Sequence, residues 1–578
     1  MSALLKAREP SAKYIVTPEA PLVRHFELLA TAPGGVARLR QLILTLAIQG
    51  KLVPQEPSDE PAEVLLRRSR ALVRDQMRIG TTKREKPAEE VQPHEMQFSL
   101  PSGWHWCRLV DTGAYINGLA FKASDFQNHG IPVIRIQNLS GRSGEFNRTT
   151  GEFDRSVLVS AGDILVSWSA TLDAFVWTGE RGVLNQHIFR VEPAPAVRKQ
   201  YVFWLLKWAI RDLADSDHAH GLVMPHINRG PFLAKPIALP PLAEQARIVT
   251  RVKELMRLCD ALEAKGRLEA AQHSQLVTTL LGTLTDSESS EALADRWQRI
   301  AAHFDILLDR PEAVDTLEQT IVQLAVRGLL VPQELTDEPA IALLRRMRSE
   351  KDKLIAEGKV KREKPASIRG EESRPFKVKV GWEWTQLIEI ATSGPTNGLS
   401  PRPSELPTAF RCLTLSATTR GYFKGDCFKY VDISTVSAQP CYLKQGDLLI
   451  QRGNSLDYVG IAALYDGADD EFIYPDLMMR LRLSQHVVPE YVHAYLISSE
   501  GRAYFKRNAT GTQGTMPKVN QATVAHTPIP LPPLAEQFRI VARVKELRRL
   551  CTDLRHRLAA AQATQAQLAE ALVAQPAP

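Results

Sequence analysis

Apolar residues recur at alternating intervals of four and three along the last part of this 578-residue chain. Such intervals place apolar side chains on one side of a helix with the heptad spacing of a coiled coil. The series consists of Ile540, Val544, Leu547, Cys551, Leu554, Leu558, Ala561, Gln565, Leu568 and Leu572, of which Gln565 alone is polar. The pattern predicts a long C-terminal helix that needs an apolar partner.

An earlier copy of the same helix is predicted in the middle of the chain. LPPLAEQARIVTRVKELMRLC begins at Leu239, and LPPLAEQFRIVARVKELRRLC begins at Leu531. Prolines suit the first turn of a helix, where the missing N–H costs nothing. A helix over residues 242–283 would be about 60 Å long. Its apolar series is Ile248, Val252, Leu255, Cys259 and Leu262, resumed at Leu276 and Leu280. The predicted helix or subunit interface consists of Ile248, Val252, Leu255, Ile540, Val544, Leu547 and Leu554.

A second duplicated block precedes each variable region. The block from His25 matches the block from His303, and both contain a short one-sided helix before a glycine, Gly50 or Gly328. We expect the helix of residues 242–283 to pack against the one near residues 313–327. The C-terminal helix then finds its equivalent partner near residues 36–49, which closes the chain into a ring of two equivalent halves.

The variable regions have the pattern of mixed α/β domains. GDILVSW from Gly162 and GDLLIQR from Gly446 read as short buried strands, and the stretches from Tyr201 and Tyr491 read as helices. The predicted class is α+β: two α/β domains separated by long antiparallel coiled-coil-like helices, with a pseudo-two-fold internal duplication. The expected variable domains are residues 92–238 and 377–530. The expected conserved helical regions are residues 1–91 at the N-terminus, 239–376 in the centre and 531–578 at the C-terminus.

Composition excludes several classes of protein. Hydrophobic residues make up 44% of the chain and charged residues 24%, and no long apolar run opens the sequence, so we expect a cytoplasmic protein. Six cysteines without a C-x-x-C pair argue against a zinc ribbon or disulfide framework, and no metal site is predicted. The net charge of +7 is compatible with a polyanionic partner. No phosphate-binding G-x-x-x-x-G-K-[ST] loop is present.

Taken in order, these motifs resemble those of the specificity subunits of Type I restriction-modification systems. The AIQGKLVPQ, DEPA, LLRR and GWEW blocks and the two PLPPLAEQ helices carry the resemblance over nearly the whole chain. It implies two target-recognition domains that each read half of a split DNA sequence. It also implies conserved helices that dock two methyltransferase subunits together with restriction subunits. S-adenosylmethionine, ATP and Mg are then expected on the partners, with no cofactor and no catalysis on this chain.

Residues that differ between the two domains at matched places are candidate reading residues, because shared residues cannot distinguish two half-sites. Their side chains offer the donors and acceptors that base edges or phosphates require. In the first domain they are Ser167, Trp168, Ser169, His220 and His226, with the shared Asn228; Arg135, Gln137, Asn138, Asn185, Gln186 and His187 are further candidates. In the second they are Gln451, Arg452, Asn454, Thr512, Gln513 and Lys518, with the shared Asn520. Residues 501–521 also hold Arg502, Lys506 and Arg507 and no acid, and this basic track is expected to follow phosphates.

Alternatives remain at several of these positions. The loops can be ordinary surface loops, the histidines from His218 can hold a metal, and Arg452 can form an intradomain ion pair. Glu357 and Lys359 have the spacing of a nuclease pair, although a solvated helix face accounts for them better. Trp104, Trp106, Trp382 and Trp384 are expected in the core rather than as stacking platforms. The rival functions are a protein-binding coiled-coil scaffold and a self-contained DNA-modifying enzyme.

Overall fold

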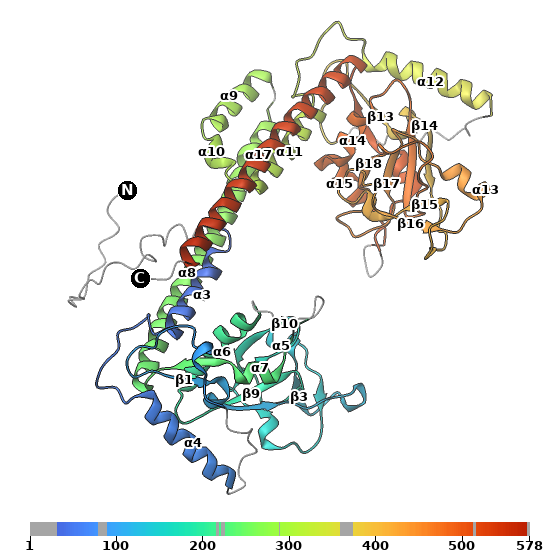
Figure 1. Cartoon of the computed structure of the whole chain (residues 1–578). Helices are drawn as coiled ribbons and strands as arrows, with labels where there is room; N and C mark the ends of the chain where they lie inside the picture. Colours follow the sequence, from blue (N-terminus) through green and yellow to red (C-terminus); the bar gives the residue numbers. More distant parts are fainter. Residues whose placement is uncertain are drawn as a thin grey trace. The chain divides into compact units, whose positions relative to one another are not determined.

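The computed structural model describes residues 32–78, 89–214, 219–220, 226–287, 289–358, 374–511 and 516–574. Two compact units divide the chain (Figure 1): unit 1 holds residues 1–268 and 562–578, and unit 2 holds residues 269–561. Each unit contains one variable domain, a short conserved helix, the start of one long helix and the end of the other. Within the described ranges, no helix is long and apolar enough to cross a membrane.

The conserved helices lie close to their predicted positions. The two long helices are α8 (Leu242–Thr285) and α17 (Leu534–Ala574), and the short ones are α3 (Gly35–Ile48) and α11 (Pro311–Val326). The chain leaves α3 through Gly50, whose φ of 70° favours glycine; a Cβ there would lie 2.4 Å from Pro101. Unit 2 adds α9 (Ser290–Ala301) and α10 (Phe304–Leu307), while α4 (Ala62–Arg78) and α12 (Ala340–Ala356) follow the two short helices.

The first variable domain is a mixed α/β structure closed at its base by two paired strands. Strand β1 (His105–Arg108) enters the domain and pairs antiparallel with β12 (Pro236–Leu239), which leaves it. Its main antiparallel sheet has the order β2 (Gly113–Asn117), β9 (Ile188–Pro193), β6 (Ile164–Ser167), β7 (Asp173–Val176). A second sheet has the order β4 (Arg148–Thr149), β3 (Ile131–Ile134), β8 (Gly182–Leu184), β5 (Leu158–Val159), and α6 (Lys199–Ala214) contacts β7.

The second variable domain repeats this plan. Strand β13 (Glu383–Gln386) pairs with β20 (Pro528–Leu531), so this domain is also closed where the chain enters and leaves it. The main sheet has the order β14 (Ala391–Asn397), β19 (Met478–Leu483), β17 (Leu448–Gln451), β18 (Ala462–Leu464), and β15 (Phe410–Leu413) pairs with β16 (Phe428–Val431). The helix predicted from Tyr491 is α14 (Pro489–Ile497), followed by α15 (Ser499–Asn508). Both predicted GD strands are confirmed as β6 and β17.

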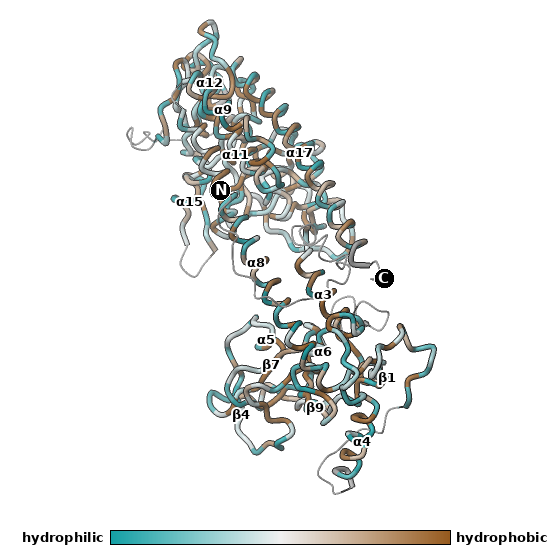
Figure 2. Tube along the Cα trace, turned by 90° about the vertical axis from the view of Figure 1, so that its left-hand side faces the viewer, coloured by the Kyte–Doolittle hydropathy of each residue, from teal (hydrophilic) through white to brown (hydrophobic). Residues whose placement is uncertain are grey.

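The apolar seam is confirmed in the first half of each long helix and is wrong at some positions of the second half, although Leu280 and Leu558 still pack against the core. Ile248, Val252 and Cys259 in α8, like Ile540, Val544 and Cys551 in α17, are buried. The predicted Leu276 and Leu568 are instead 51% and 52% exposed, and Val277 and Ala569, one residue further on, are buried. A straight helix drifts relative to a strict heptad, which moves the inner face by about one position over this length. Figure 2 shows apolar and polar residues interleaved along both helices.

The predicted return of the C-terminal helix to the N-terminal one is confirmed within unit 1. Arg38 of α3 donates to the carbonyl oxygen of Ala566 and faces Glu570, both at the end of α17. Ala569 belongs to the same buried core as Leu39. In unit 2 the end of α8 takes the matching place, since Val277 and Leu281 share a core with α11.

A buried polar cluster joins each variable domain to the start of its long helix. In unit 1 the Trp104 indole N–H donates to Glu244 Oε2 at 3.0 Å, and Gln55 Nε2 donates to Glu244 Oε1 at 3.1 Å. The neighbouring Gln245 side chain accepts from the Arg198 N–H at 2.8 Å and donates to Pro240 O at 3.0 Å. Both Glu244 and Gln245 are almost fully buried. We call this set of contacts the unit 1 junction.

Unit 2 has the same junction at the equivalent positions. The Trp382 indole N–H donates to Glu536 Oε2 at 2.9 Å, and Gln537 accepts from the Val488 N–H and donates to Pro532 O, each at 2.9 Å. The duplicated Ala-Glu-Gln sequence at the start of each long helix is therefore explained, because its glutamate and glutamine attach a variable domain to the helix. The predicted core location is confirmed for Trp104, Trp382 and Trp384, which are buried, and Trp106 is partly buried.

The junction predicts a pH dependence of stability. Burial raises the pKa of the Glu244 and Glu536 carboxyls above the ordinary value. A raised carboxyl pKa makes ionisation costlier in the folded state, so stability is complete at low pH and falls as pH rises from about 4.3, the unfolded value, through the raised value. Replacing both residues by glutamine keeps an acceptor for each indole N–H and removes this ionisation. The unfolding midpoint of Glu244→Gln/Glu536→Gln relative to wild type should therefore rise between about pH 4.5 and pH 8.

The matched control is Glu254→Gln/Glu546→Gln, which alters exposed glutamates of the same two helices. Its midpoint relative to wild type should change little over this range. A junction variant whose midpoint difference stays constant with pH would contradict the assignment of the raised pKa to these carboxyls.

Candidate nucleic-acid interface

Three separate segments of the first variable domain meet at the end of strand β6. Trp168, in the turn after β6, donates its backbone N–H to His187 O at 3.4 Å and accepts from the Ile227 N–H at 3.0 Å. His187 ends the Asn185–His187 segment, and Ile227 lies in β11 (His226–Ile227) just before Asn228. The structure thus brings together the predicted turn, the predicted NQH segment and the end of the predicted histidine loop.

The second variable domain builds the same backbone frame. Arg452, in the turn after β17, donates its N–H to Leu477 O at 2.7 Å and accepts from the Val519 N–H at 2.8 Å. Asn454 N–H adds a bond to Pro517 O at 3.2 Å. We call these two arrangements reading frame 1 and reading frame 2. Their backbone bonds match, while Trp168 and His187 stand where Arg452 and Leu477 stand.

The side chains of reading frame 1 are aromatic. The Trp168 ring stacks on Phe189 with centroids 5.9 Å apart and lies 5.2 Å from the His187 ring. Gln186 is exposed, and its Nε2 lies 3.1 Å from His187 Nε2. The Trp168 Nε1 and His187 Nδ1 atoms are buried without a hydrogen-bond partner in the described part of the chain. The serines are inward: Ser167 is buried and donates to Ser169 O at 3.1 Å.

A neighbouring turn holds the other candidates of the first domain. Asn185 N–H donates to Ile134 O at 3.1 Å, which places the NQH segment beside the end of β3 and the following Arg135. Arg135 Nη1 donates to Asn147 Oδ1 at 3.1 Å. The Asn138 side chain accepts from the Arg135 N–H and donates to Glu145 O, so it holds the turn that carries α5 (Ile136–Leu139). Gln137 is partly exposed on α5.

Reading frame 2 has an inner supporting layer and an outer basic one. Gln451 is buried, and its amide donates to Leu415 O at 2.8 Å and Thr418 Oγ1 at 2.9 Å. Asn454 donates to Gln451 Oε1 at 2.7 Å. These two side chains support the turn from the protein side. Arg452 is partly exposed and forms no ion pair with any residue that the structure describes, and Lys518 is exposed.

The basic track expected around residues 501–521 is partly neutralised by an acid that lies far away in the sequence. Lys506 Nζ lies 3.0 Å from Asp457 Oδ1, and Arg502 donates to Asp457 O at 2.9 Å. Burial lowers the pKa of Arg502. Arg507 donates to Ala503 O, and Asn520 caps α16 (Gln521–Ala525) by accepting from the Thr523 N–H. Lys518 therefore remains the exposed cation that is nearest to the frame in the sequence.

The remaining candidates are described in part. His220 and His226 are paired in the backbone register of the short strands β10 (Ala219–His220) and β11, and Asn228 is exposed ahead of α7 (Arg229–Ala234). Thr512, Gln513, His218 and Lys359 lie outside the described residues. In the described ranges no three histidine, cysteine, aspartate or glutamate side chains form a metal-binding group.

Sequence reasoning missed Asp476 and Leu477, the counterparts of Gln186 and His187. The signal was available in the strands that follow, since IFRV from Ile188 aligns with MMRL from Met478, and Ile188 and Met478 both open the strand next to β6 or β17. The missed Asp457 had no such signal.

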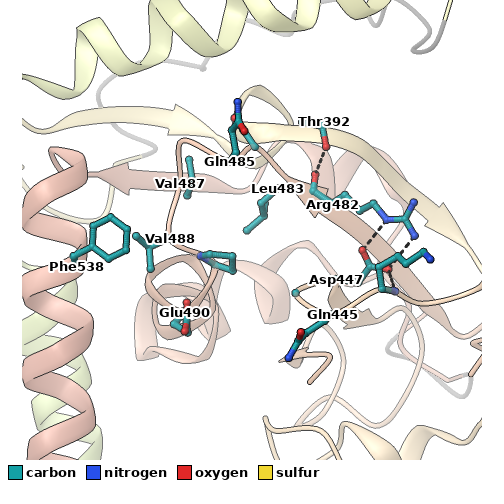
Figure 3. A pocket seen from close by; sticks show the side chains of 14 residues that line it. Thr392, Gln445, Asp447, Arg482, Leu483, Gln485, Val487, Val488, Glu490 and Phe538 are labelled. Carbon is teal, nitrogen blue, oxygen red and sulfur yellow. Dashed lines mark hydrogen bonds and ion pairs between the residues drawn. The ribbon is translucent and has the colours of Figure 1, made fainter. Parts of the chain in front are cut away.

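A separate pocket lies at the base of the second variable domain. It has a volume of about 590 Å³ and is lined by Val488, Glu490, the Arg482–Asp447 ion pair and Phe538, a 60% exposed side chain at the start of α17 (Figure 3). None of the residues of reading frame 2 lines it. The pocket therefore belongs to the junction region rather than to the reading frame.

Comparisons with known proteins identify the family. The model of the Type I restriction modification DNA specificity domain matches residues 101–273 and 381–561, which together exceed half of the chain. The specificity subunits of the Type I restriction enzymes EcoEI and EcoAI of Escherichia coli are each 32% identical over 93% of this chain and 93% of their own length. A solved chain from a type I R-M system aligns over 82% of this chain and 98% of its own length, with 16% identity and a TM-score of 0.45. On the family model and the sequence identities, the chain belongs to the Type I restriction-modification DNA specificity family.

Proposed function

We propose that this chain reads a split DNA sequence with its two reading frames, each frame contacting one half. The carrying observation is that the two frames share their backbone hydrogen bonds and differ in the side chains attached to them. Shared backbone positions a surface in the same way in both domains, and differing donors, acceptors and aromatic faces select different bases. The second domain presents Arg452, whose guanidinium suits the O6 and N7 acceptors of guanine in the major groove.

The proposal assigns the chemistry to partners. The chain itself acts without catalysis and binds no cofactor; S-adenosylmethionine, ATP and Mg belong to methyltransferase and restriction subunits that it brings to the DNA. Methylation of a base requires the base to leave the stack, which a dedicated partner active site accomplishes. Purified chain that methylated DNA without added subunits would refute this part.

Two identical stripes on the long helices suit two copies of one partner. Five exposed residues of α8 recur at the equivalent positions of α17, although their neighbours Thr250 and Asp260 are replaced by Ala542 and Thr552. The stripe of α8 is Arg251, Lys253, Glu254, Arg257 and Leu258, and that of α17 is Arg543, Lys545, Glu546, Arg549 and Leu550. Leu258 and Leu550 are 55% and 57% exposed. Exposed side chains have no packing reason to stay identical, so we assign the stripes to the docking of two methyltransferase subunits.

The reading assignment predicts separable effects in reading frame 2. Arg452→Ala should lower affinity by about 1–3 kcal/mol for the preferred base at one position and relax selection there. Lys518→Ala should weaken binding to all sequences and reduce its salt dependence. The measurement is equilibrium binding of the assembled methyltransferase to a panel of single-base variants. Equal weakening by Arg452→Ala on every sequence would mark it as a phosphate contact.

A domain exchange tests the proposed function as a whole. Residues 107–238 are replaced by residues 385–530, so the cuts fall at matched points of the paired strands β1–β12 and β13–β20. We expect the chimera, expressed with its methyltransferase, to direct methylation to a site in which the second half-site occurs twice as an inverted repeat. Sequencing of modified bases in the host DNA reads the outcome. An unchanged wild-type motif would overturn the proposal, and a direct repeat would overturn the two-fold relation.

The docking assignment predicts stoichiometry. Leu258→Asp and Leu550→Asp should each reduce the complex from two methyltransferase subunits to one, and the double variant should bind none, because a carboxylate in an apolar contact is costly. Native mass spectrometry of the reconstituted complex measures this. Val436→Asp, which changes an 85% exposed side chain of the second variable domain, is the control and should leave two subunits bound. A double variant that still binds two would place the docking surface elsewhere.

A further inference from the structure

The short and long helices of unit 1 are joined by a cation on the short helix and acids on the long one. Arg40 of α3 lies 2.6 Å from Asp260 Oδ1 and 2.9 Å from Glu263 Oε2 of α8. These contacts flank the apolar core in which Leu39 and Cys259 are buried.

Unit 2 joins its short and long helices with the opposite signs. Glu318 of α11 lies 2.9 Å from Arg555 and 3.2 Å from Arg548 of α17, and Asp315 lies 2.7 Å from Arg555. Here the acids stand on the short helix and the cations on the long one.

The reversal occurs at equivalent positions of the duplication. Arg40 and Glu318 occupy the same place in the two short helices, and Glu263 and Arg555 occupy the same place in the two long helices. At the other charged positions, Ala37, Met256 and Asp260 stand where Asp315, Arg548 and Thr552 stand. The apolar residues between these charges and the outward stripes of the same helices are nearly unchanged. The residues that form the ion pairs between the helices are thus reversed in charge or replaced, while the apolar residues between them match.

Duplicated helices with the same apolar face can exchange partners. α3 would fit α17 of another copy of the chain about as well as it fits α8, since the buried apolar residues of the long helices match. With the charges as they stand, exchange would place Arg40 against Arg548 and Arg555, and Glu318 against Asp260 and Glu263. Specificity depends on the difference between two pairings, and repulsion in the wrong one adds to attraction in the right one. One exposed pair contributes little, but the unit 1 cluster holds three charges and the unit 2 cluster holds four.

We propose that the reversed charges are a pairing code, which keeps each short helix on the long helix that begins in its own unit and prevents two copies of the chain from exchanging their conserved helices. The partner excluded by this surface is a second copy of this chain. The code goes beyond DNA recognition and does not rest on it, because it concerns which helices assemble before any DNA is bound.

The test gives both units the same charges, using residues that the chain already contains at the equivalent positions. Ala37→Asp/Arg40→Glu/Met256→Arg/Asp260→Thr/Glu263→Arg gives unit 1 the charges of unit 2, so correct and exchanged pairings become equally attractive. Two differently tagged copies of the full chain are co-expressed, one tag is used for purification, and the second tag is quantified. We expect the share of mixed-tag complexes to rise about tenfold over wild type, with a cooperative thermal transition retained.

A second variant makes the opposite change. Asp315→Ala/Glu318→Arg/Arg548→Met/Thr552→Asp/Arg555→Glu gives unit 2 the charges of unit 1 and should raise exchange in the same way. Wild type at about 1 M salt should also exchange more than at about 0.1 M, since salt screens exposed charges. Wild-type levels of mixed-tag complexes in whichever equalised variants retain a cooperative transition would overturn the proposal. Loss of that transition in both variants would also overturn it, because it would show that the two charge patterns are not interchangeable.

Discussion

The junction between indole, carboxyl and carboxamide groups is the constraint on which the rest of this architecture depends. The chain enters and leaves each variable domain next to the first turn of a long helix. Glu244 and Glu536 hold the tryptophan that precedes the domain, while Gln245 and Gln537 satisfy backbone groups beside the strand that follows it. Buried polar groups with several partners are costly to rearrange, so the domain has a defined orientation on the helix.

Outside that junction the variable domains are free to diverge. The paired strands β1–β12 and β13–β20 close each domain at its base, which confines the consequences of sequence change to the region beyond them. Within the domains, the turn after β6 or β17 keeps its backbone bonds while Trp168 is replaced by Arg452. A fixed frame with exchangeable side chains is what recognition of two different half-sites requires, because position and selectivity are then separate properties.

The long helices serve different requirements on different sides. Their inner apolar residues are retained because packing demands them, and their outer stripes are retained although packing does not. The charges beside the inner face are reversed between Arg40 and Glu318 and between Glu263 and Arg555. One duplicated helix thus carries a common core, a common outer surface and a distinguishing set of charges.

The sequence by itself determined the duplication, the fold class, the long helices, the buried tryptophans and the family, because these depend on local periodicity and on motifs that recur along the chain. It misplaced the inner face near Leu276 and Leu568, since heptad spacing ignores the drift of a straight helix. Only the tertiary structure decided that Gln451 supports its turn from within, that Asp457 pairs with Lys506, and that the reading segments meet. Those properties depend on contacts between residues far apart in the chain, and no local pattern of side chains records which distant groups will face one another.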